Sequence, residues 1–69
     1  MYAGLGQMPI ALRDLIMDRI RTVGREETRL RDLAAQAMAS GQLGRARALA
    51  QQVSILMRSR GSLEYMLFR

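Results

Sequence analysis

Few side chains in this sequence could carry out chemistry. The 69 residues include no His, no Cys and no Lys, so the usual general bases, nucleophiles and Schiff-base amines are missing. Asp, Glu, Tyr and Ser remain, and no group of them is spaced as a catalytic set. We therefore expect a non-enzymatic protein with no catalytic residues.

Asp14 and Asp18 come closest to a metal site. They lie one helical turn apart, so their carboxylates could share a divalent cation with carboxylates of a partner. The alternative is a solvated pair close to a helix start, where negative charge interacts favourably with the helix dipole. This alternative is the more common arrangement, and zinc would lack its Cys and His ligands. The sequence thus predicts no metal site and no cofactor.

All 11 basic residues are Arg, and the net charge is +5. The charge is unevenly spread: residues 1–32 contain six Arg and five acids, whereas residues 33–69 contain five Arg and only Glu64. Arg binds phosphate and carboxylate groups through two parallel hydrogen bonds, although a GC-rich genome also favours Arg over Lys. The candidate anion contacts are four basic residues of the second half: Arg45, Arg47, Arg58 and Arg60.

These four residues support one alternative function, the binding of nucleic acid or of an anionic membrane surface. The sequence has no recognition-helix or RNA-binding motif, and its three aromatic residues are too few for base stacking. A solvated basic face is the simpler interpretation. Nucleic-acid or membrane binding therefore stays the second hypothesis.

The elements that must position these residues are two helices. Helical patterning runs from Pro9 to Ala39 and resumes at Gly44 or Arg45, so residues 40–44 are the expected chain reversal. Gly41 can take the left-handed conformation that closes a helix. We predict an all-α helical hairpin over residues 9–69, after a flexible tail of residues 1–8.

Two glycines interrupt the helical pattern and leave its continuity open. The first helix either runs straight through Gly24 or bends there, and continuity is the favoured interpretation. Near the C-terminus, Gly61 is either tolerated or a break, with Ser62 capping a short last helix.

Apolar residues recur at steps of three and four residues, which predicts the face that each helix buries. The seam is interrupted by Glu27 in the first helix and continues to Arg60 in the second. We expect ion pairs between Glu27 and Arg31 and between Arg29 and Asp32. The residues predicted to face inward are Leu12, Ile16, Ile20, Val23, Leu30, Leu33, Ala37, Leu49, Val53 and Leu56.

A chain of this length cannot easily stabilise itself. A single small core contributes no more than about 3–5 kcal/mol, and there is no Cys for a disulfide. Association with a partner protein or with further copies is the remaining source of stability. The predicted partner interface comprises Leu12, Ile16, Ile20, Leu56, Met57, Leu63, Met66, Leu67 and Phe68.

Targeting signals are not apparent in the sequence. No stretch approaches the 18 or so apolar residues of a membrane span, and residues 1–7 lack the basic and apolar regions of a signal peptide. We expect a cytoplasmic protein or one exported by a signal-less route.

Two resemblances suggest a class of assembly. Residues 33–50 look like the hairpin of a tetratricopeptide repeat, with Ala at close-contact points and Gly in the turn. The size, the hairpin and the apolar C-terminal helix resemble small subunits of bacterial type III secretion systems, either needle and inner-rod subunits or needle co-chaperones. The ending Leu67-Phe68-Arg69 is similar to the Phe-Arg terminus of several needle subunits, whereas residues 40–44 replace their Pro-containing turn. The resemblance implies a small helical subunit or co-chaperone of a secretion apparatus.

Overall fold

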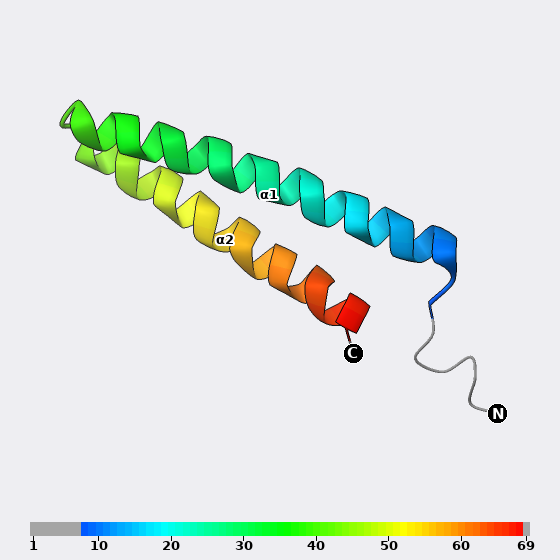
Figure 1. Ribbon diagram of the computed structural model, residues 1–69. Coiled ribbons are helices and arrows are strands. Elements are labelled where there is room, and N and C mark those ends of the chain that lie inside the picture. Colours follow the sequence, from blue (N-terminus) through cyan, green and yellow to red (C-terminus); the bar gives the residue numbers. More distant parts are fainter. Residues whose placement is uncertain (1–7, 69) are drawn as a thin grey trace.

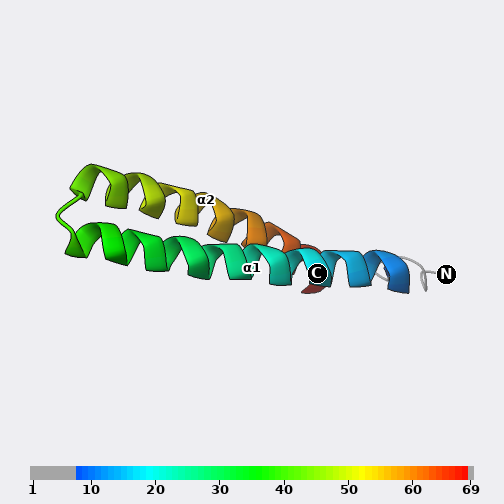
Figure 2. The same cartoon turned by 90° about the horizontal axis from the view of Figure 1, so that it is seen from above.

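The computed structural model describes residues 8–68, and these form two antiparallel α-helices. Helix α1 spans Ile10–Ala39 (30 residues) and helix α2 spans Leu43–Phe68 (26 residues). The helices lie side by side, and both views show α1 reaching past the end of α2 (Figure 1 and Figure 2). The all-α helical hairpin is thereby confirmed. Of the expected flexible tail, residues 1–7 lie outside the described residues, as does Arg69.

The turn between the helices is a Schellman motif. Gly41 has a φ of +76°, its N–H donates to the Met38 carbonyl, and the Gln42 N–H donates to the Ala37 carbonyl at 2.8 Å. The predicted reversal over residues 40–44 is therefore right in place but too long. Helix α2 begins at Leu43, not at Gly44 or Arg45, because the Gln42 carbonyl already accepts the N–H of Ala46 at 2.9 Å.

Both helices continue through the glycines that could have broken them. Helix α1 runs through Gly24 and helix α2 through Gly61 without interruption. Ser62 is not a helix cap, because its hydroxyl donates to the Arg58 carbonyl one turn earlier in the same helix. Continuity of α1 is confirmed, and a separate last helix is excluded for residues 43–68.

The buried seam is narrow. Six apolar residues form it: Ile16, Val23, Leu30, Ala37, Ala46 and Val53. Ala37 and Ala46 lie beside the turn, where small side chains let the two helices approach each other closely. Four other residues predicted to face inward are half-buried: Ile20, Leu33, Leu49 and Leu56.

The inward placement of Leu12 was wrong, because its side chain is 44% exposed. Glu27 pairs with Arg60 across the hairpin and fixes the register of the two helices. Leu12 lies 15 residues before Glu27, whereas the described part of α2 extends only eight residues beyond Arg60. Leu12 is therefore on the correct face of α1 but has no turn of α2 opposite it.

Candidate interaction surface

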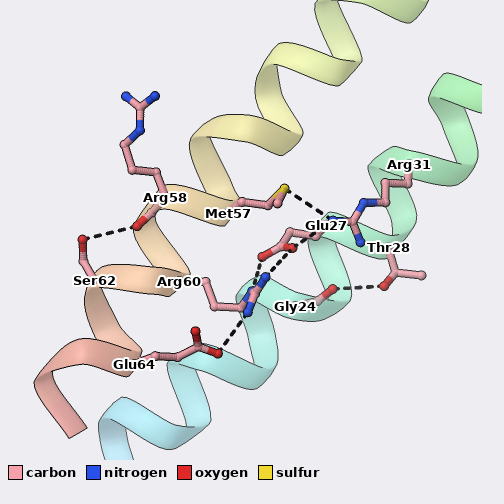
Figure 3. Close-up of polar contacts among 9 residues, drawn as sticks. All are labelled: Gly24, Glu27, Thr28, Arg31, Met57, Arg58, Arg60, Ser62 and Glu64. Atoms are coloured by element: carbon pink, nitrogen blue, oxygen red, sulfur yellow. Dashed lines mark hydrogen bonds and ion pairs between the residues drawn. The ribbon is translucent and has the colours of Figure 1, made fainter. Parts of the chain in front are cut away.

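A buried ion pair holds the middle of the hairpin. Glu27 occupies a seam position of α1 and is only 2% exposed. Arg60 reaches it from α2 with Nε 2.6 Å from Oε2 and Nη2 3.3 Å from Oε1, a two-point contact (Figure 3). Arg31 adds a second positive charge, with Nη2 3.7 Å from Oε1 of Glu27. The charged interruption of the apolar seam is thus fully compensated within the chain.

Arg60 is shared between two carboxylates. Its Nη1 also donates to Oε2 of Glu64 at 3.0 Å, one turn further along α2 (Figure 3). The hydrogen bond to Glu27, then the one to Glu64, raise the pKa of Arg60. Because these two carboxylates occupy its guanidinium, Arg60 is the least suitable of the four candidate anion contacts.

Sequence reasoning found both members of this pair but did not join them. Glu27 was identified as the position that interrupts one seam, and Arg60 as a residue on the other. Charge complementarity could have joined them, because a single acid on one seam and a single base on the facing seam can form an ion pair.

Two ion pairs within α1 were also predicted, with mixed outcome. The pair of Glu27 and Arg31 is present. Arg29 instead bonds Glu26, with Nη2 2.6 Å from Oε2 and Nε 3.0 Å from Oε1. The prediction that Arg29 pairs with Asp32 was therefore wrong, because the two carboxylate oxygens of Glu26, three residues before Arg29, already accept from its guanidinium. The hydrogen bond from Arg29 lowers the pKa of Glu26.

An apolar hollow of about 210 Å³ opens between the helices at the end far from the turn. It is lined by Met17, Ile20 and Arg21 of α1 and by Glu64, Leu67 and Phe68 of α2. The structure thus brings together Ile20, Leu67 and Phe68 of the predicted interface. Met17 is an addition that sequence reasoning missed, because it lies off the buried seam.

The other predicted interface residues divide by exposure. Leu12, Met57, Met66 and Phe68 are exposed, Leu56 and Leu63 are half-buried, and Ile16 belongs to the buried seam. Ile16 is therefore unable to meet a partner directly. Exposed large apolar residues outside the predicted interface are Ile10, Leu15, Met17, Met38, Leu43, Ile55 and Tyr65.

The remaining candidate anion contacts all lie on α2. Arg47 and Arg58 are 11 residues apart, about three turns, so they share one side of the helix. Arg58 points away from α1 (Figure 3). Arg45 lines a shallow hollow of about 150 Å³ beside the turn, together with Gln36 and Gln42. Within residues 8–68, no ion pair involves Arg45, Arg47 or Arg58.

Metal ligands do not gather in the part of the chain that the structure describes. No three acidic side chains come together there, and Asp14 and Asp18 are both exposed on α1. Neither described helix is long and apolar enough to cross a membrane.

Comparison with known proteins gives no relative for this chain. No family model, no curated protein and no solved structure matches it.

Proposed function

We propose that this chain is a non-enzymatic helical protein–protein interaction module, a small subunit or co-chaperone of a larger assembly. One observation carries the proposal: apolar side chains at the open end of the hairpin are left uncovered by the packing of residues 8–68. Met17, Phe68 and Leu12 are exposed there, and the first two line an apolar hollow. Exposed apolar surface of this kind is typical of an interface.

The narrow buried seam supports the same proposal. None of its six apolar residues is a large aromatic, and two of them are Ala. A core of this size contributes only about 3–5 kcal/mol to folding. Burial of the exposed apolar residues against another chain would supply the missing stability.

A bacterial secretion apparatus is our proposed assembly, and this part rests on the sequence resemblance alone. The chain would then act in the cytoplasm or after export by a signal-less route. Arg47 and Arg58 favour a second candidate function, the binding of nucleic acid or an anionic membrane surface, because both are exposed and carry no ion pair in residues 8–68.

Sedimentation equilibrium and far-ultraviolet circular dichroism test the proposal over a concentration series. We expect helix content and thermal midpoint to rise with concentration or on addition of a partner, because association completes the core. Association through apolar surfaces should persist at 0.5 M salt, whereas phosphate binding should weaken steeply. A monomer that unfolds cooperatively, at the same temperature whatever its micromolar concentration, would refute the proposal.

A further inference from the structure

Helix α2 carries a second row of residues outside the buried seam. Six residues of α2 recur at steps of three or four residues, so they share one side of the helix, and every one of them is exposed. One of them, Ile55, also borders a hollow of about 240 Å³ with Glu26 and Leu30 of α1. We call this set the outer face of α2; its residues are Ala48, Gln51, Ile55, Arg58, Ser62 and Met66.

Arg58 lies in the middle of the outer face, between Ile55 and Met66. The inner seam of the same helix shows how this chain accommodates such a residue: Arg60 is matched by Glu27 of the facing helix. Arg58 has no ion pair in the described part of the chain. The only acid of α2, Glu64, already bonds Arg60, so α2 itself offers Arg58 no other acidic side chain.

The N-terminal segment of α1, residues 10–18, has the complementary composition. Ile10, Asp14 and Met17 follow each other at steps of four and three residues, so they share one side of the helix. All three side chains are exposed, Ile10 at 77%. The start of this segment lies in the part of α1 that reaches past the end of α2 (Figure 1), and Met17 lies where α2 ends, beside Leu67 and Phe68.

We propose that the N-terminal segment of α1 in one copy packs antiparallel on the outer face of α2 in a second copy. The steps match in this direction: Asp14 meets Arg58, Met17 meets Ile55, and Ile10 meets Ser62. The inference rests on the proposed function and names the partner as the chain itself. The two surfaces differ, so each copy can bind two neighbours in a head-to-tail contact.

Charge favours this occupant over the alternatives. Pairing two outer faces of α2 would bring Arg58 against a second Arg58 or leave it against uncharged residues. Nucleic acid or a membrane surface would use Arg58 but would give Asp14 no role.

The experiment is a charge exchange between two variants, Arg58→Glu and Asp14→Arg, studied by sedimentation equilibrium. Each variant alone should associate about tenfold more weakly than the wild type, because like charges then meet in the contact. An equimolar mixture should recover wild-type association, since the two introduced side chains carry opposite charges that pair across chains, and each chain keeps one native surface. Matched controls are Arg25→Glu and Asp32→Arg, which change the charge equally elsewhere on α1 and should alter association less than about threefold.

Circular dichroism shows whether each variant keeps its helix. Recovery in the mixture supports the inference, because a folding defect would persist in both chains. Failure of the mixture to recover, with helix retained, would overturn it. The inference would also be overturned if Arg58→Glu lost binding to a single-stranded oligonucleotide but kept the wild-type oligomer mass in sedimentation equilibrium.

The absence of Cys allows a direct check of the register. A Met17→Cys chain mixed with an Ile55→Cys chain should form a disulfide-linked pair on mild oxidation, since the bond requires Cα atoms within about 7 Å. A Met38→Cys chain mixed with Ile55→Cys should not. Equal yields from both mixtures would overturn the proposed contact. If the wild type associates but the charge variants associate equally well, the proposed contact is wrong and the proposed function still stands. If the wild type is a cooperatively folded monomer, both proposals are wrong.

Discussion

Arg60 of α2 binds both oxygens of Glu27 of α1, with Nε 2.6 Å from Oε2 and Nη2 3.3 Å from Oε1. This contact joins residues 33 positions apart and sits in an otherwise apolar seam. Only one alignment of the two helices places this acid opposite this base. The pair therefore defines the register of the hairpin, a role that well-matched polar groups in helical seams are known to serve.

Arg60→Ala should destabilise the hairpin strongly, because it leaves the Glu27 carboxylate buried with only Arg31 nearby at 3.7 Å. A buried carboxylate that loses its partner is strongly destabilising, so the variant should lose much of the free energy of unfolding, although the remaining charge of Arg31 reduces the loss. Urea denaturation followed by circular dichroism measures the change. The matched control, Arg47→Ala, removes an exposed Arg of the same helix and should stay within about 0.5 kcal/mol. Equal losses from both variants would contradict the role of the pair.

The double variant Glu27→Leu, Arg60→Leu should separate stability from specificity. Replacing a buried ion pair by apolar residues is often neutral or stabilising by about 1–4 kcal/mol, so the free energy of unfolding should not fall. The register should become less defined, because no charge then distinguishes one alignment from the next. Broader amide signals in a nitrogen–proton correlation spectrum would report this, and sharp signals at wild-type dispersion would contradict it.

Much of the fold followed from local rules, and the failures have both local and interhelical causes. Gly41 marked the turn because few other residues adopt its positive φ. The start of α2 was predicted one or two residues too late. The helix begins with the hydrogen bond from the Ala46 N–H to the Gln42 carbonyl, which depends on the backbone conformation of the turn and not on a particular residue type. Leu12 was assigned inward because periodicity identifies a face but does not say where the opposite helix ends.

The candidate surface was predictable only in part, for the same reason. Leu67 and Phe68 were expected at an interface and do line the open-end hollow. Ile55 and Met17 were missed, because a residue off the main seam has no distinguishing signal until the seam itself is placed. The match of Glu27 with Arg60 needed the register that only the folded hairpin provides.

Two glycines give opposite predictions on replacement by Ala. Gly41→Ala should lower stability by about 1 kcal/mol or more, because φ is +76° and a Cβ strains that conformation. Gly61→Ala should raise stability by about 0.5–1 kcal/mol, because the added Cβ meets nothing within 4 Å and Ala favours the helix. Thermal denaturation of the two variants under the same conditions measures both. Destabilisation by Gly61→Ala would contradict a continuous α2.

The Glu26 carboxyl should titrate below its ordinary pKa of 4.5, because the hydrogen bond from Arg29 stabilises its charged form. A pKa that is lowered on folding contributes stability above the unfolded value, and this contribution is lost as the pH falls through the folded value. Carbon-detected NMR titration of the side chain measures the pKa. In Arg29→Gln it should return towards 4.5, and a carboxyl that titrates at the same pH in both proteins would exclude the pairing in solution.

The last prediction separates apolar association from phosphate binding. The double variant Met17→Ser, Phe68→Ser removes two exposed side chains of the open-end hollow and should weaken association more than about tenfold, since each buried side chain of this size contributes about 1.5–3 kcal/mol. Its matched control, Met38→Ser with Leu43→Ser, removes apolar residues of comparable exposure beside the turn and should have little effect.

A second double variant, Arg45→Gln with Arg47→Gln, completes this comparison. It should leave association intact, because neither residue lies on the hollow or in the proposed contact of Arg58 with Asp14. Phosphate-driven binding would instead weaken and show a shallower dependence on salt, since fewer counterions are released. Sedimentation equilibrium measures the association, and oligonucleotide titration measures phosphate binding. Both are done at about 50 mM and about 500 mM salt. Loss of partner binding in the Arg variant, with retention in the Met17 and Phe68 variant, would favour the basic surface as the functional site.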